Sequence, residues 1–333
     1  MVTGPTHKQR SAAGLAGAGT APGVARLDLA IGDASSASCI VKLTSLPEVT
    51  AHRLVDAALP RMAPKFLQAV PLSDGDPRHA RYLLVMEDCC AKQPATTLTA
   101  LLARRHRRGT QTYLNAAIQQ VAALHRRFET CAAELERRGI GPAVTSRVPD
   151  AHEVASVIER ALRLSACGGG DEDLGAQCAA ISQGMSDFFS RMRNKERHTL
   201  VHGDLHFDNI LVTETDRLIM VDWGAVATAN PCWDLVFFGP DELATYLYAT
   251  GMRARRYRED FLEDHRAAVA VRMFDLLQAA MNLKRHRPSE VRSAVDVIIR
   301  NLARVAQRPY RGGIGFRAAR RPPKTNRLRS LKI

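Results

Sequence analysis

The chain has 333 residues, of which 46% are hydrophobic and 24% are charged, and its formal net charge at pH 7 is +13. This length and composition exclude a chain that is disordered throughout, because they allow one large hydrophobic core or two lobes that share a cleft. The positive charge is compatible with a nucleic-acid partner, but nine basic residues and no acidic one lie together in residues 308–333.

Residues 1 to about 20 are mostly small or polar and contain closely spaced glycines at 14, 17 and 19, so we expect a disordered N-terminus. This stretch holds no apolar run as long as that of a signal peptide. No window of the chain approaches the roughly 20 apolar residues that would span a bilayer. The sequence therefore predicts a cytoplasmic protein without a membrane span.

The cysteines are scattered, with no Cys-x-x-Cys pair and no histidine at metal-binding spacing. An odd number of scattered cysteines indicates neither a disulfide framework nor a zinc site. We interpret them as buried thiols. They are Cys39, Cys89, Cys90, Cys131, Cys167, Cys178 and Cys232.

Residues 21–89 show the patterns of a small, β-rich lobe. Apolar residues alternate imperfectly over 24–31, and Cys39–Leu43 is a short apolar segment interrupted by one lysine, so we expect two strands here. A helix is expected over Glu48–Leu59, where prolines follow, and a further strand over Tyr82–Met86.

Residues 90–307 are dominated by apolar residues at helical spacing, which predicts a larger helical lobe. Together the two regions predict an α+β, two-lobed architecture, followed by a disordered basic tail over 308–333. The expected helices are Thr112–Phe128, Glu153–Leu164, Leu174–Met192, Phe261–Asn282 and Ala294–Val305.

One segment interrupts the helical pattern. Asn209–Thr213 and Leu218–Asp222 read as two strands around the polar turn Glu214–Arg217. We expect an isolated β-hairpin inside the helical lobe. Such an irregularity indicates a functional site.

Three oxygen-bearing side chains meet at the ends of this hairpin. A phosphoryl-transfer site needs a carboxylate that accepts the proton of the attacking hydroxyl, and oxygen ligands for Mg²⁺. Asp204 suits the first role, while Asn209 and Asp222 suit the second, because a hairpin brings its two ends side by side. The five-residue step from Asp204 to Asn209 allows a tight loop that directs both side chains into one cleft.

The segments His202–Asn209, with the sequence HGDLHFDN, and Val221–Gly224, with the sequence VDWG, resemble the catalytic loop and metal-binding motif of the aminoglycoside phosphotransferase and choline kinase-like family. This resemblance, over roughly residues 20–300, implies a protein-kinase-like fold, ATP and Mg²⁺. It implies that Asp204 is the catalytic base, that Asn209 and Asp222 bind Mg²⁺, and that His202 packs beneath the loop.

The resemblance also implies a lysine and a glutamate that form an ion pair holding the nucleotide phosphates. Lys42 fits, since a lysine flanked by apolar strand residues needs a partner for its ammonium group. Glu48 is its best partner, although it equally suits a favourable interaction with the helix dipole. Backbone groups between Glu87 and Cys89 are expected to contact the purine.

Other residues near the motifs have less defined roles. The resemblance implies that Asp234 hydrogen-bonds the catalytic loop. His206 either contacts the substrate or is a hydrogen-bonded spacer. The family's strand before a glycine-rich turn has no match in residues 12–16, so that either the start is truncated or a looser loop covers the nucleotide.

The sequence leaves the acceptor open. Acidic residues after 240 suit a cationic small molecule with a hydroxyl group, such as an aminoglycoside or another antibiotic, or choline, and no specific nucleic acid is expected. These residues are Asp241, Glu242, Glu259, Asp260, Glu263, Asp264 and Asp275.

The alternative function is that of a nucleotide-binding pseudokinase, or of a basic scaffold whose tail holds nucleic acid or an anionic membrane. The complete set of catalytic motifs argues against it. A protein kinase is disfavoured, because no activation-loop pattern follows Gly224.

Overall fold

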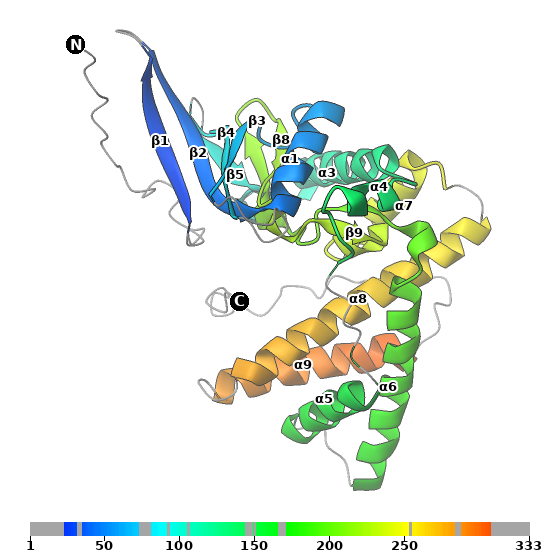
Figure 1. Ribbon diagram of the computed structural model, residues 1–333. Helices are drawn as coiled ribbons and strands as arrows, with labels where there is room; N and C mark the ends of the chain where they lie inside the picture. Colours follow the sequence, from blue (N-terminus) through cyan, green and yellow to red (C-terminus); the bar gives the residue numbers. More distant parts are fainter. Residues whose placement is uncertain are drawn as a thin grey trace. The chain divides into compact units, whose positions relative to one another are not determined.

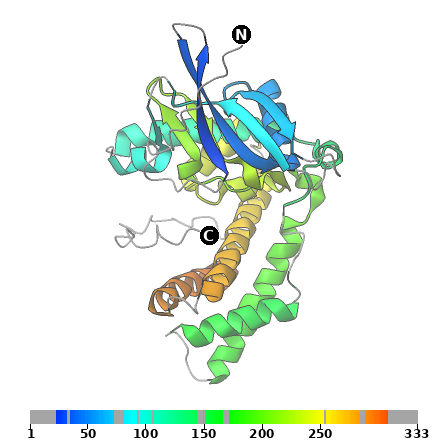
Figure 2. The same cartoon turned by 60° about the vertical axis from the view of Figure 1, so that its left-hand side comes forward.

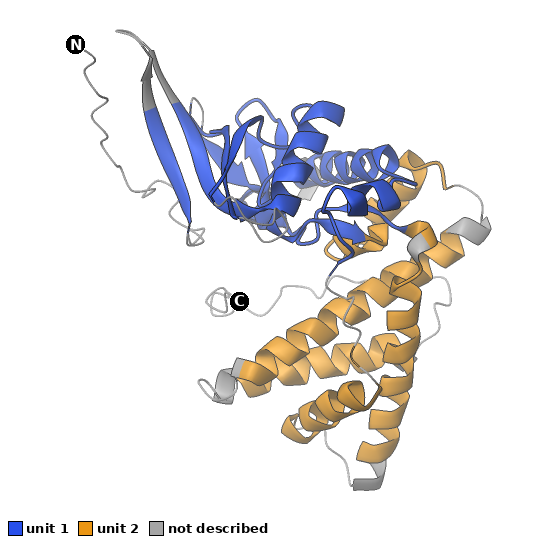
Figure 3. Cartoon of the chain, in the orientation of Figure 1, with its two compact units in different colours: residues 1–143, 198–228 blue, residues 144–197, 229–333 orange. Residues whose placement is uncertain are grey.

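A computed structural model describes residues 23–31, 35–72, 81–91, 94–104, 107–143, 149, 151–165, 171–252, 255–283 and 288–307 of the chain (Figure 1). The N-terminus 1–20 and the basic tail 308–333, both expected to be disordered, lie outside the described residues. The chain divides into two compact units, Met1–Ala143 with His198–Thr228, and Val144–Arg197 with Ala229–Ile333 (Figure 3). The expected lobe boundary at residues 89 and 90 falls inside the first unit, and the division into lobes stays a prediction.

A four-stranded antiparallel sheet begins the first unit, with the strand order β1-β2-β4-β3 (Figure 2). The strands expected from the sequence at 24–31, Cys39–Leu43 and Tyr82–Met86 are confirmed. The third strand was not predicted, because most of its side chains are exposed and show no apolar alternation. The strands are β1 (Val24–Ile31), β2 (Ser35–Ser45), β3 (Phe66–Pro71) and β4 (Arg81–Glu87).

Helix α1 (Leu46–Ala58) follows β2 directly and confirms the helix expected at Glu48–Leu59. Pro47 lies in its first turn, where a missing N–H costs nothing. Val49 packs with Leu84 and Met86 of β4 in a buried cluster, and burying an apolar side chain of this size contributes about 1.5–3 kcal/mol. This packing fixes α1 against the sheet, which matters because α1 carries Glu48.

The predicted hairpin forms between β7 (Ile210–Thr213) and β8 (Leu218–Met220), with Ile210 opposite Met220. The expectation that it is isolated is wrong, because β5 (Ala95–Thr97) pairs with β7 and completes a three-stranded sheet. A strand of three residues is too short to show a period in the sequence. The short strands β6 (Thr199–Val201) and β9 (Ala227–Ala229) form a separate pair.

Helices and short 3₁₀ turns complete the first unit. Helix α3 confirms the helix expected at Thr112–Phe128 and buries Ile118, Val121 and Leu124. Its Gln120 side chain donates a hydrogen bond to the carbonyl of Leu218, at a distance of 3.3 Å. These elements are α2 (Leu98–Arg104), α3 (Arg107–Arg127), α4 (Ala132–Arg137), η3 (Phe207–Asn209) and η4 (Trp223–Ala225).

The second unit is helical. Helices α6, α8 and α9 pack against one another, and α5 packs against all three, so that their apolar faces form one core (Figure 1). The helices expected at Glu153–Leu164, Leu174–Met192, Phe261–Asn282 and Ala294–Val305 are confirmed. The elements are α5 (Ala151–Leu164), α6 (Asp171–Met192), η2 (Lys195–Arg197), η5 (Pro231–Leu235), α7 (Pro240–Ala249), α8 (Arg255–Leu283) and α9 (Pro288–Gln307).

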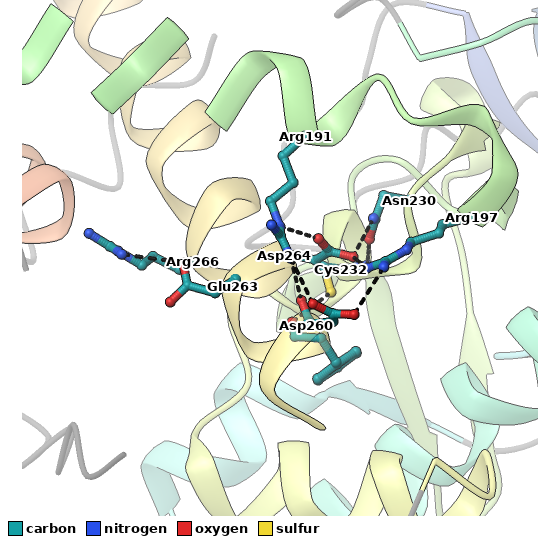
Figure 4. A network of polar contacts seen from close by, with 9 residues as sticks. Arg191, Arg197, Asn230, Cys232, Asp260, Glu263, Asp264 and Arg266 are labelled. Carbon is teal, nitrogen blue, oxygen red and sulfur yellow. Dashed lines mark hydrogen bonds and ion pairs between the residues drawn. The ribbon is translucent and has the colours of Figure 1, made fainter. Parts of the chain in front are cut away.

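A buried carboxylate ties these helices together (Figure 4). Asp264 of α8 is 3% exposed and accepts hydrogen bonds from Nε of Arg191 at 2.5 Å and Nη1 of Arg197 at 2.6 Å. Asn230 donates a third, at 3.1 Å, and Asp260 approaches both arginines. A buried charge needs such partners, because desolvating an unpaired carboxylate is costly.

Some of the acids expected to meet a cationic acceptor are therefore occupied by the chain itself. Asp264 belongs to this buried network, Glu263 pairs with Arg266 at 3.2 Å, and Glu242 accepts the backbone N–H of Gly239 at 2.9 Å. Contacts within the fold therefore account for these three carboxylates.

Among the described helices, none is both long and apolar enough to cross a membrane.

Candidate active site

The ion pair expected between β2 and α1 is present. Nζ of Lys42 donates a hydrogen bond to Oε1 of Glu48 at 2.8 Å. The short step of six positions from Lys42 to Glu48 suffices because β2 runs straight into α1, which places Glu48 in the first helical turn beside the end of the strand. The hydroxyl group of Thr44 also donates a hydrogen bond to Glu48, which is 1% exposed. Of the two roles left open for Glu48, the structure shows the ion pair.

The same ammonium group contacts the metal-binding motif. Nζ of Lys42 lies 2.6 Å from Oδ1 of Asp222, the second residue after β8. Gly224 lies beside all three charges: a β-carbon there would stand 3.6–3.7 Å from side-chain atoms of Asp222, Glu48 and Lys42. Three residues from distant parts of the first unit thus meet at one point.

The three charges support one another. Burial alone would lower the pKa of Lys42, but the carboxylates of Glu48 and Asp222 outweigh it and raise that pKa above its ordinary value. Desolvation would raise the pKa of Asp222, but the hydrogen bond and the charge of Lys42, together with the nearby His202 and His206, outweigh this and lower it. Lysine and aspartate are therefore both ionised at neutral pH.

The backbone at Asp222 is unusual. Its φ of 63° and ψ of 62° are left-handed, which costs a residue other than glycine of the order of 1–3 kcal/mol unless its surroundings enforce it. Here the buried Trp223 follows, and its indole N–H donates to the carbonyl of Met220 at 3.0 Å. This conformation turns the Asp222 carboxylate toward Lys42 instead of continuing the strand.

Asn209 joins the catalytic loop to the metal-binding motif. Its side-chain Nδ2 donates to the carbonyl of Asp204 at 2.9 Å, and its own carbonyl accepts the N–H of Val221 at 2.9 Å. Because the amide nitrogen is used inside the loop, Oδ1 is the atom that stays available as an oxygen ligand. The bond to Val221 holds Asn209 beside the residue that precedes Asp222.

Asp204 presents its carboxylate at the surface of this cluster. The side chain is 48% exposed, and Oδ2 lies 3.7 Å from Nε2 of His206. The other nitrogen of His206 lies 4.0 Å from Asp208. His206 therefore stands between two carboxylates, and its two possible roles, substrate contact or spacer, both stay predictions.

The loop that carries Asp204 has little freedom. Gly203 has a φ of +84°, and a β-carbon at this position would stand 1.9 Å from the carbonyl oxygen of Ala225. His202 is fully buried, its Nε2 lies 2.9 Å from the carbonyl of Val221, and its ring centre lies 4.7 Å from that of Trp223. Only glycine permits this approach, and His202 occupies the packing position expected for it.

Sequence reasoning missed two contributors to the site. His52 of α1 is 1% exposed and lies 4.0 Å from Oε1 of Glu48, with its ring edge against Trp223. Its position four residues after Glu48 on one helix face is a signal that the sequence contains. Thr44, the hydroxyl donor to Glu48, lies two positions after Lys42 on the same strand face, which is also readable from strand periodicity.

The expected purine contacts lie on the neighbouring strand. Glu87 ends β4 and faces Cys39 of β2, three residues before Lys42. Its backbone N–H donates to the carbonyl of Lys65 at 2.9 Å, while Cys89 follows the strand. Glu87 and Cys89 do not contact the charged cluster, and their role toward a purine stays a prediction. Asp234 is fully buried in η5 of the second unit, and its contact with the catalytic loop also stays a prediction.

The donor set suits a hard cation. Among the described residues, no three His, Cys, Asp or Glu side chains gather to hold a metal ion. Asn209 and Asp222 offer two oxygen donors that suit a divalent ion. This matches Mg²⁺, which takes one or two protein oxygens together with water and phosphate.

Comparisons with known proteins show which family and which solved structures the chain is similar to. The family model described as "Phosphotransferase enzyme family" (APH) matches residues 31–274. No curated protein sequence matches the chain.

Solved structures of phosphotransferases share the fold. A GDP complex of a mutant aminoglycoside 2'-phosphotransferase-IIIa is 15% identical, with a TM-score of 0.51, over 84% of this chain and 91% of that one. Spectinomycin phosphotransferase APH(9)-Ia, in complex with ADP and spectinomycin, is also 15% identical, with a TM-score of 0.51, over 87% of this chain and 90% of that one.

Proposed function

Because this chain belongs to the phosphotransferase enzyme family, we propose that it transfers the terminal phosphate of ATP, with Mg²⁺, to a hydroxyl group of a small molecule. The observation that carries the proposal is the position of Lys42, whose ammonium group is held between Glu48 and Asp222. A lysine fixed in this way offers positive charge to the phosphates. The use of ATP makes the cytoplasm the expected location.

The residues divide the work. Lys42, anchored by the buried Glu48, holds the phosphates of the nucleotide, and Asp204 orients the acceptor hydroxyl and accepts its proton. The acceptor oxygen bonds to the terminal phosphorus while the bond from that phosphorus to the bridging oxygen breaks, which releases the nucleoside diphosphate. Asn209 and Asp222 would hold Mg²⁺, which when bound neutralises phosphate charge.

Asp204→Asn tests this assignment most directly. The amide cannot accept the proton, so we expect phosphate transfer to fall about 10²–10⁴-fold while ATP binding persists. Asp208→Asn is the matched control, because it makes the same change four residues away in the same loop, on a side chain that is 62% exposed. Radioactive or coupled phosphate-transfer assays measure both variants. Turnover retained by Asp204→Asn refutes the base assignment.

For the acceptor, we propose an amine-bearing alcohol, such as an aminoglycoside, a related antibiotic or an amino alcohol like choline. The support is the family and the spectinomycin bound by a protein of the same fold. If the acceptor is an antibiotic, the enzyme confers resistance. A panel of hydroxylated antibiotics and metabolites, screened by ATP consumption, identifies the class, and a panel in which only neutral alcohols react contradicts the cationic preference.

A further inference from the structure

A second buried carboxylate lies in the first unit, at the end of β4. The side chain of Asp88 is 3% exposed and accepts a hydrogen bond from Nε of Arg26, another from Oγ of Ser38 at 2.7 Å and a third from the backbone N–H of Cys90 at 2.9 Å. One carboxylate therefore joins β1, β2 and the chain that follows β4.

The sheet register explains this convergence. Cys39 faces Glu87 across the β2–β4 pair, so the preceding residue, Ser38, lies next to Asp88. Arg26 faces Ile40 across the β1–β2 pair, on the same side of the sheet as Ser38, because residues two apart in a strand share a face. Strand pairing thus fixes two partners of Asp88, Arg26 and Ser38, while the third, Cys90, lies in the turn that follows β4.

The charge on Asp88 is maintained. Burial alone would raise its pKa, but the hydrogen bonds from Arg26, Ser38 and Cys90 outweigh burial and lower that pKa below its ordinary value. A carboxylate that is buried, ionised and three times hydrogen-bonded holds its backbone firmly, because moving it would leave a charge without partners.

Asp88 lies between the two residues whose backbone is expected to contact the purine. The N–H of Glu87 is used by Lys65, and the N–H of Cys90 by Asp88 itself. Within the described part of the chain, no hydrogen bond occupies the N–H of Cys89. An unused donor between two fixed neighbours is suited to a ligand acceptor.

We propose that Asp88 is a positioning residue for the purine: through Arg26, Ser38 and Cys90 it holds the backbone from Glu87 to Cys89 in the conformation that binds the base. This inference rests on the proposed nucleotide-dependent function. If it is right, the affinity for the base depends on Asp88, whereas the affinity for the phosphates depends on Lys42, so that the two can be changed independently.

The test measures the two halves of the nucleotide separately. Adenosine reports on the base site, and inorganic tripolyphosphate with Mg²⁺ reports on the phosphate site, with affinities taken from titration calorimetry. For Asp88→Asn, we expect adenosine affinity to fall about tenfold, while tripolyphosphate affinity stays within about twofold. In turnover, the KM for ATP should rise while kcat changes little.

Two further variants guard against a general loss of structure. Ser38→Ala removes one of three hydrogen bonds and should weaken adenosine binding less than Asp88→Asn, in the same direction. Asp264→Asn is the matched control, since it neutralises a buried, arginine-paired carboxylate in the other unit and should lower the melting temperature without a selective loss of adenosine. Arg26→Lys, which keeps the charge, should restore most of the adenosine affinity lost in Arg26→Ala.

The outcomes separate the two proposals. If Asp88→Asn and Ser38→Ala, both folded by circular dichroism, bind adenosine as the unaltered protein does, the positioning role is wrong and the phosphotransfer proposal stands. Equal losses for adenosine and tripolyphosphate also contradict the positioning role. If the unaltered protein binds neither ATP nor adenosine, both proposals fail. If Asp88→Asn does not fold, the Ser38→Ala result decides.

Discussion

At the scale of single residues, the contrast between the two carboxylates that hold Lys42 is informative. The Glu48 side chain is 2% exposed, whereas that of Asp222 is 55% exposed. The buried glutamate, bound also by Thr44, is a fixed anchor. For the proposed function, we expect the exposed aspartate to exchange the ammonium group for a metal ion with little loss of free energy, because solvent already screens that pair.

Replacing Lys42 should separate catalysis from folding. In Lys42→Met we expect kcat/KM for ATP to fall about 10²–10³-fold, and stability to fall because Glu48 loses its partner in a buried site. The double variant Lys42→Met/Glu48→Leu should regain stability but not activity. Lys65→Met, which alters an exposed lysine, is the control for both measurements. Activity regained by the double variant would contradict the role of the ammonium group.

His52 makes stability depend on pH. Its burial and the nearby charge of Lys42 lower its pKa from 6.5 to about 4. The folded state therefore resists protonation that the unfolded state accepts. The resulting stability is complete above pH 6.5 and is lost as the pH falls toward 4, by about 3 kcal/mol.

His52→Leu should remove this dependence. Leucine fills similar space without polar atoms, so we expect equal or greater stability at pH 7.5, and a smaller loss between pH 6.5 and 4.5 than in the unaltered protein. Urea unfolding at a series of pH values measures both. Identical pH profiles for the two proteins would show that His52 does not titrate on unfolding.

At the scale of elements, the sequence predicted those whose pattern is long or chemically marked. The apolar faces of α3, α6 and α8 repeat over several turns, and the hairpin is framed by Asn209 and Asp222. β3 was not predicted because most of its side chains are exposed, so the sequence shows no apolar alternation. β5 was not predicted because it has only three residues. Their strand pairing is determined by neighbours that are distant in the sequence, which no local pattern records.

The candidate site shows the same limit. Asp204, Asn209 and Asp222 could be identified from the sequence because phosphoryl transfer requires these residue types at this spacing. The pairing of Glu48 with Lys42 could not be predicted from the sequence alone. An acidic residue in the first turn of a helix can either form an ion pair or interact favourably with the helix dipole. The path of the chain from β2 into α1 decides between them. The left-handed backbone of Asp222 likewise has no local sequence signature.

The turn between α3 and α4 offers a test at this scale. Thr130 is exposed and has a φ of 65°, a left-handed conformation that β-branched residues strongly disfavour. Thr130→Gly should raise the free energy of unfolding by about 1 kcal/mol, because glycine adopts this conformation without strain. Thr130→Ala keeps most of the strain and should gain less. Denaturant unfolding compares them, and equal stabilities would show that the turn is relaxed.

At the scale of the whole molecule, the net charge can be separated from the proposed chemistry. Deleting residues 309–333 removes eight basic residues and no acidic one, which lowers the formal net charge from +13 to +5. We expect the shortened protein to keep its kcat. It should elute from heparin at a lower salt concentration, because the affinity of a protein for a polyanion increases with its number of cationic side chains. A scaffold that depends on its tail would instead lose its nucleic-acid or membrane partner on this deletion.

Every side chain assigned here to phosphate transfer or base binding belongs to the first unit, whose segments are Met1–Ala143 and His198–Thr228. The remaining helices contribute none of them. We therefore expect a chimera that keeps these two segments, and takes its other residues from a relative that also has an aspartate at the position of Asp234, to retain the proposed reaction. Any change in the compounds it modifies would trace to the transplanted helices, so that diversification of substrate range need not disturb the reaction itself.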